Sequence, residues 1–133
     1  MSKAIGDIAE AYVIYRLFTY GHNAQLFFCD NVPYDAVVEI DGRLYKVQIK
    51  GTANPDPSRV NSCRFSTSKG CYADTYYTKE DFDILALVYT GVERCLFIPN
   101  TSGFSKCKRI STSKFNEAEE RGSWHEAIKT LNA

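Results

Sequence analysis

Three polar residues within the stretch PYDAVVEIDGRLYKVQIK could act together at one site: Asp35, Gln48 and Lys50. A carboxylate and an amide oxygen can ligate a hard divalent cation, and an ammonium can orient water or offset negative charge. The stretch predicts two strands, because apolar and polar residues alternate on either side of Asp41-Gly42, a strong signal for a two-residue hairpin turn. The chemistry therefore depends on how the two strands pair.

The turn sets that pairing. It places Ile40 opposite Arg43 and, counting outward, Asp35 opposite Gln48. Because side chains alternate between the two faces of a strand, Lys50 shares a face with Asp35 and is its diagonal neighbour. The alternative interpretation is a solvated hairpin face on which Asp35 and Lys50 form a surface ion pair.

Hydrophobic periodicity predicts the elements that hold this hairpin. Residues 2–20 form an amphipathic helix that ends at Gly21, with Glu10 at the edge of the apolar stripe, where it either stays exposed or leans into a cleft beside the sheet. A final helix is expected from Ser123, which with Glu126 matches a capping box. Further strands are expected at residues 24–29, 60–67, 82–90 and 94–99. This order indicates an α+β fold in which helices pack on a sheet.

Bulk composition narrows the class of protein. The 133 residues, 44% of them hydrophobic, fit a single domain, 1–133, with a full core. Five cysteines without C-x-x-C spacing favour neither a disulfide framework nor a zinc site. No signal peptide or membrane-spanning segment is recognisable, so we expect a soluble, intracellular (cytoplasmic) protein.

Charge is segregated along the chain, although the formal net charge is zero. Residues 94–114 carry five basic residues and no acid, and residues 59–71 carry three and no acid. Such segregation permits a basic face on a neutral protein. The alternative is an ordinary solvated loop.

The motifs together resemble the PD-(D/E)XK nuclease superfamily, most closely its small phage, cyanobacterial and group I intron-associated homing endonucleases. The resemblance rests on GDIAEAY with Glu10, PYD with Asp35, VQIK with Gln48 and Lys50, and the strand pair DFDILALVY and CLFIP. It implies an α/β/α-like, restriction-endonuclease-like core with an N-terminal helix, a central mixed sheet that carries the β-hairpin, and a C-terminal helix. The chain departs from the superfamily at Gln48, where most members place Asp or Glu.

The resemblance implies a Mg²⁺-dependent DNA endonuclease in which Mn²⁺ can substitute. Glu10, Asp35, Gln48 and the Ile49 carbonyl would ligate the metal. Lys50 would orient or activate the attacking water, with its pKa lowered by burial and by the metal. The candidate catalytic residues are thus Glu10, Asp35, Gln48 and Lys50. The candidate DNA contacts are Arg59, Arg64, Lys69, Tyr76, Lys106, Lys108 and Arg109.

Several functions remain open at this stage. A homing-type, sequence-specific endonuclease and a Holliday-junction-resolving nuclease both cut two strands, so either would need two active sites in a homodimer or homotetramer. A nuclease-like DNA-binding module without catalysis is the second class, with Gln48 as the sign of a decayed site. A structural domain that does not bind nucleic acid is the third.

Overall fold

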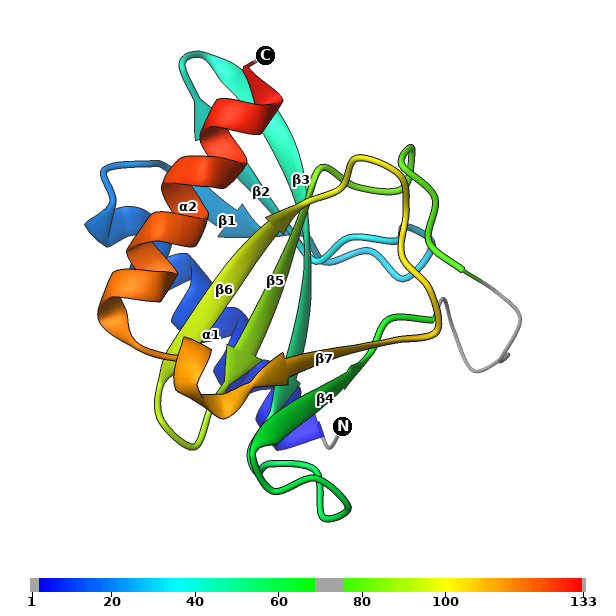
Figure 1. Cartoon of the computed structure of the whole chain (residues 1–133). Coiled ribbons are helices and arrows are strands. Elements are labelled where there is room, and N and C mark those ends of the chain that lie inside the picture. Colours follow the sequence, from blue (N-terminus) through cyan, green and yellow to red (C-terminus); the bar gives the residue numbers. More distant parts are fainter. Residues whose placement is uncertain (1–2, 69–75, 133) are drawn as a thin grey trace.

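The computed structural model describes residues 3–68 and 76–132 (Figure 1). The elements in chain order are α1 (Lys3–Thr19), β1 (Ala24–Leu26), β2 (Ala36–Ile40), β3 (Arg43–Thr52), β4 (Ser62–Ser66), β5 (Ile84–Tyr89), β6 (Arg94–Pro99), β7 (Cys107–Ser111), a 3₁₀ turn (Thr112–Lys114) and α2 (Glu117–Leu131). Within the described residues, five strands form a mixed sheet in the order β1-β2-β3-β5-β6, and β4 and β7 form a separate ribbon. None of the described helices is long and apolar enough to cross a bilayer.

The hairpin has the predicted register. Asp41 and Gly42 both adopt positive φ, 51° and 81°, which closes a two-residue turn. Ile40 pairs with Arg43, and the ladder continues residue by residue to Ala36 opposite Val47. The register inferred from the turn is thus confirmed as far as Ala36–Val47, and Asp35 and Gln48 each lie one residue beyond that last pair.

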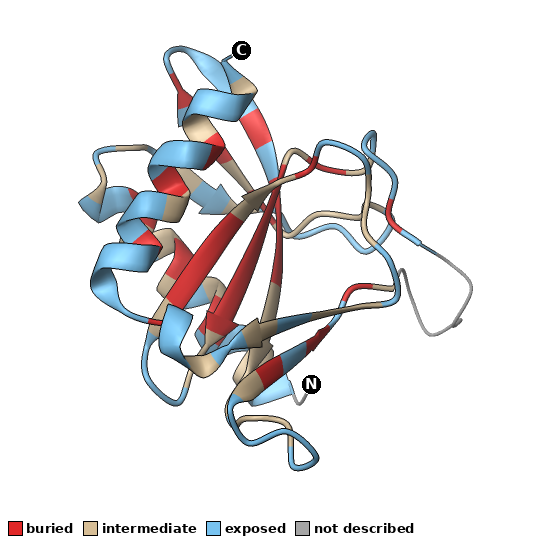
Figure 2. Cartoon of the chain, viewed as in Figure 1, coloured by how far each residue is buried: buried red, intermediate tan, exposed pale blue. Residues whose placement is uncertain are grey.

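The sheet carries a different cover on each face. Residues of β5 alternate between the two: Ala86 and Val88 belong to the core beneath α1 and α2, whereas Leu85 and Leu87 belong to the core beneath the β4–β7 ribbon. Figure 1 shows both helices on one side of the sheet and the ribbon on the other. Figure 2 shows that buried residues are concentrated in β5 and β6. The run ILALVY is therefore the central, doubly buried strand that its composition predicts.

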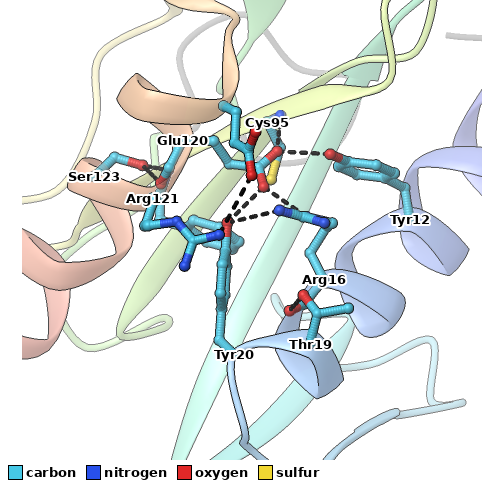
Figure 3. Close-up of polar contacts among 10 residues, drawn as sticks. Tyr12, Arg16, Thr19, Tyr20, Cys95, Glu120, Arg121 and Ser123 are labelled. Carbon is cyan, nitrogen blue, oxygen red and sulfur yellow. Dashed lines mark hydrogen bonds and ion pairs between the residues drawn. The ribbon is translucent and has the colours of Figure 1, made fainter.

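A buried carboxylate joins the two helices to the sheet (Figure 3). Glu120, on α2, is fully buried, and it accepts hydrogen bonds from the Tyr12 hydroxyl (2.6 Å), the Tyr20 hydroxyl (2.5 Å), Arg16 Nε (2.7 Å) and the Cys95 amide (3.0 Å). Burial alone would raise the pKa of Glu120. The hydrogen bonds outweigh it, and the pKa lies below its ordinary value.

The start predicted for the last helix was wrong. The last helix begins at Glu117, because the Asn116 side chain caps it by accepting a hydrogen bond from the Glu119 amide (2.9 Å). Ser123 is inside the helix, where its hydroxyl accepts from the Phe97 amide (3.0 Å). The basic segment, for which no strand was predicted, contains strand β7.

Candidate active site

The candidate residues gather where β2 and β3 part. β2 begins at Ala36, but β3 runs on to Thr52 and pairs with β5 from Val47 onward. Asp35 precedes β2; its amide donates to the Val47 carbonyl (2.8 Å), and its Oδ2 accepts from the Ile49 amide (2.8 Å). The N–H and C=O of one strand residue point toward the same neighbouring strand. The Ile49 carbonyl therefore points to the side of β3 on which Asp35 lies.

Gln48 is nearly enclosed beside Asp35. It is 6% exposed, and with Asp35 and Tyr77 it lines a pocket of about 380 Å³. Within residues 3–68 and 76–132 the Gln48 side chain makes no hydrogen bond, so its amide group is open to the pocket. Polar groups in such enclosed positions normally have a partner. The Gln48 amide is thus a nearly buried polar group that lacks a partner among the described residues.

Lys50 lies two residues after Gln48 on β3, so their side chains are on the same face of the strand. Its Nζ lies 5.7 Å from the centre of the Tyr77 ring, a cation–π contact. Burial lowers the pKa of Lys50, and the charge of Asp35 partly opposes that shift. Burial likewise raises the pKa of Asp35, opposed by the Ile49 amide and by Lys50. The two groups thus share a poorly solvated site in which their charges interact.

Glu10 approaches this site from α1. It is half-buried, and burial is the largest cause that raises its pKa, followed by the negative charge of Asp35. The structure thus brings all four candidate catalytic residues, Glu10, Asp35, Gln48 and Lys50, into one region, although it does not test their roles.

The donor set suits a magnesium ion. No group of three or more His, Cys, Asp or Glu side chains close enough to hold one metal occurs in the described part of the chain. Two carboxylates, from Glu10 and Asp35, are available instead, with the Gln48 amide oxygen and the Ile49 carbonyl beside Asp35. Mg²⁺ takes oxygen ligands and keeps several waters, so it is held with one or two carboxylates rather than a full protein cage.

Sequence reasoning missed part of the pocket wall. Asp30, Asn31 and Asp81 line it together with Tyr77. The Thr78 amide donates to Asp81 Oδ2 (2.8 Å), a local turn that the spacing of the two residues indicates. No local pattern marks Asp30 or Asn31, because the loop before β2 reaches the pocket only through tertiary packing.

Two of the candidate DNA-contacting residues lie on the outward face of the β4–β7 ribbon. Arg64 and Arg109 lie directly opposite each other in the β4–β7 ribbon, on its outward face, and Arg109 is ion-paired with Asp56. Hydrogen bonds from Ser58, and then the bond from Arg109, lower the pKa of Asp56 to about 2. These contacts fix the Arg109 guanidinium in place on the ribbon surface.

The other candidate DNA-contacting residues come from several segments of the chain. Arg59, Tyr76 and Lys106 are exposed on loops. Lys108 lies opposite Phe65, whose side chain is in the core, so Lys108 is on the inward face of the ribbon and not beside Arg109. Lys69 lies outside the described residues. Among the described residues, Lys108 therefore points away from the face that carries Arg64 and Arg109.

Comparison with known proteins agrees with this geometry. The family model for PD-(D/E)XK endonucleases matches residues 1–129. The chain belongs to the PD-(D/E)XK endonuclease family. Its fold is similar to that of a bacterial homing endonuclease, I-Ssp6803I, with a TM-score of 0.71 and 19% sequence identity over 98% of this chain and 93% of that chain. No curated protein matches the chain. The predicted superfamily and its restriction-endonuclease-like fold are confirmed, and family membership supports nuclease activity.

Proposed function

We propose that this family member is a Mg²⁺-dependent DNA endonuclease whose active site is built from Glu10, Asp35, Gln48 and Lys50. The observation that carries the proposal is the enclosed Gln48 amide, which opens without a partner in the described chain onto the pocket that Asp35 lines. An amide in that position has no evident role in packing. Its oxygen could serve as a ligand of a divalent metal ion.

Each residue contributes a distinct function to phosphodiester hydrolysis. Asp35 and Glu10 would hold the metal by charge, and Gln48 and the Ile49 carbonyl would add neutral oxygens. A bound Mg²⁺, or Mn²⁺ in its place, would activate water and neutralise charge on the phosphate. Lys50 cannot ligate a metal while protonated. Its ammonium, close to Asp35 and against the Tyr77 ring, would orient the attacking water and offset charge that builds on the phosphate.

A nicking assay on plasmid DNA with Mg²⁺, Mn²⁺ or EDTA tests the proposal. We expect cleavage with either metal and none with EDTA, and we expect Asp35→Asn and Lys50→Met each to reduce the rate by about 100-fold or more. The matched controls are Glu39→Gln and Lys46→Met, exposed residues of the same types on the same two strands. DNA binding in Ca²⁺ should persist in all four variants. Undiminished cleavage by Asp35→Asn, or equal losses in the controls, would refute the assignment.

The same experiments test the two alternatives in which the protein is not an enzyme. A decayed nuclease that only binds DNA would shift DNA in gels but nick nothing with any metal. A purely structural domain would show no salt-dependent DNA binding at all.

We further propose a homing-type, sequence-specific target. The likeness to a homing endonuclease over nearly the whole of both chains supports this choice over junction resolution. Gel-shift competition between a four-way junction and a linear duplex library distinguishes the two: preferential enrichment of one linear sequence supports the homing type, and preference for the junction refutes it.

Cleavage of both strands requires two active sites, so we propose a homodimer or homotetramer. Phe28, 88% exposed, projects beside an apolar groove of about 760 Å³ between α1 and β1 that Tyr15, Phe18 and Leu26 help to line. A projecting ring next to an apolar groove on one surface is self-complementary, because a two-fold axis can place each ring in the partner's groove. Light scattering should give a multiple of the 15.0 kDa chain mass, and Phe28→Ser should shift it toward the monomer. A monomeric parent protein would refute the assembly.

A further inference from the structure

A second pocket lies next to the candidate active site. It measures about 280 Å³ and is formed where β6 ends and β7 begins. The segment between these strands packs on Tyr77, which itself lines the active-site pocket: the Phe104 amide donates to the Tyr77 carbonyl (3.0 Å), and a Cβ added to Gly103 would lie 2.4 Å from that same oxygen. Gly103 and Phe104, which line the second pocket, therefore contact Tyr77, which lines the active-site pocket.

The lining of this pocket is rich in hydrogen-bond donors. Among the described residues that line it there is one cation, Lys108, and no acid. The hydroxyl-bearing lining residues are Thr101, Ser102 and Ser105, together with Thr67, whose hydroxyl already donates to the Ser105 carbonyl. This composition contrasts with the neighbouring active-site pocket, whose lining includes Asp30, Asp35 and Asp81.

The strand register turns Lys108 toward this pocket. Lys108 pairs with Phe65, which is 2% exposed and belongs to the core beneath the ribbon. Directly opposed residues share a face, so Lys108 extends inward, whereas Arg109 is on the outward face with Arg64. The half-buried Lys108 accordingly lines the pocket, beside Ile98 of β6.

Asn100 fixes the loop that supplies the other donors. Its buried side chain donates to the Thr78 carbonyl (2.9 Å) and the Phe82 carbonyl (2.8 Å), and it accepts from the Gly103 amide (2.9 Å). Over the described residues, the amides of Thr101 and Ser102 have no hydrogen-bond partner within the chain. The loop that Asn100 holds in place thus offers N–H groups and hydroxyls, and Lys108 adds an ammonium. These are the groups that bind an anion.

We infer that this pocket binds a backbone phosphate of the DNA strand whose scissile bond lies in the active site. The inference rests on the proposed function, because it takes the occupant of the active-site pocket to be DNA. Adjacent pockets of opposite character suit one polyanion: the acidic pocket accepts a phosphate with its metal, and the pocket of donors accepts another phosphate directly. Lys108 is thereby a phosphate-positioning residue, in a different place from the outward arginines.

Salt-dependent DNA binding in EDTA tests the inference without any cleavage. One lost phosphate contact should reduce the slope of log Kobs against log salt concentration by about 0.9. We expect Lys108→Gln to produce that reduction and to weaken binding equally for all duplex sequences. Lys129→Gln, an exposed lysine on α2, is the matched control and should leave the slope unchanged.

A second variant keeps the test decisive if Lys108→Gln fails to fold. Ser102 is exposed, so Ser102→Glu introduces a carboxylate at the pocket without disturbing the core, and it should weaken binding more than the exposed control Thr130→Glu. Thermal unfolding of each variant checks folding.

Inorganic phosphate distinguishes a DNA site from a site for a free anion. We expect millimolar phosphate to shift the amide resonances of Ser102 and Lys108, and DNA to displace it. If Lys108→Gln and Ser102→Glu bind DNA with the affinity and salt slope of their controls, the inference is wrong, whether or not free phosphate binds. Failure of the proposed function would appear elsewhere, as undiminished nicking by Asp35→Asn.

Discussion

Replacing Glu120 by alanine should destabilise the fold strongly. The substitution leaves the Arg16 guanidinium without its carboxylate, and it removes the acceptor of the Tyr12 and Tyr20 hydroxyls and of the Cys95 amide. The Arg16 side chain is only 12% exposed, so water restores little of the lost interaction. Removing one partner of such a buried pair costs about 3–5 kcal/mol. That is a large share of the roughly 5–15 kcal/mol that stabilises a typical domain.

Urea unfolding at neutral pH measures this loss. The exposed Glu126 on the same helix provides the control, because Glu126→Ala should change the free energy of unfolding by about 0.5 kcal/mol or less. The pH dependence supplies a second check. Since the pKa of Glu120 is lowered in the folded protein, its contribution is complete above its ordinary pKa and is lost as the pH falls through the folded value. A loss of under about 1 kcal/mol, or a loss that stays constant into acid, would refute the reasoning.

Three further predictions concern the site and its supports. Gln48→Glu should tighten Mn²⁺ binding by about tenfold and Gln48→Leu should weaken it, measured by calorimetry; equal affinities would remove Gln48 from the metal site. Because burial raises the pKa values of Asp35 and Glu10 in the metal-free protein, protons should compete with Mn²⁺, and its affinity should begin to fall at a higher pH than carboxylates of ordinary pKa would give; a flat profile would contradict this. Gly103→Ala should lower the free energy of unfolding by more than about 2 kcal/mol, because φ is +82° and the new Cβ meets the Tyr77 carbonyl; Gly122→Ala, where a Cβ meets nothing within 4 Å, should not lower it.

The sequence predicts the hairpin well because its signals are local. Asp41-Gly42 determines the turn, the turn determines the register, and the register places Asp35 and Gln48 each one residue beyond the Ala36–Val47 pair. The N-terminal helix and the buried β5 likewise follow from periodicity and composition. These elements contain all the candidate catalytic residues, so the site could be proposed before the fold was known.

Features that depend on distant parts of the chain could not be predicted in this way. β7 pairs with β4 more than 40 residues earlier, and only that pairing reveals that Lys108 is directed inward. Glu120 belongs to an acidic run typical of a solvated helix start, yet it is fully buried because Arg16 and two tyrosines of the N-terminal segment surround it. The wall of the active-site pocket likewise combines loops whose approach no local pattern encodes.

The β4–β7 ribbon shares no strand ladder with the central sheet among the described residues; it adheres through side chains such as Phe65 and Cys63. Its outward positions, including Arg64, can therefore change sequence without altering the hydrogen bonds that align β2 with β3. Substitutions on the outward face of the ribbon are thus separable from the strand pairing that positions the candidate active site.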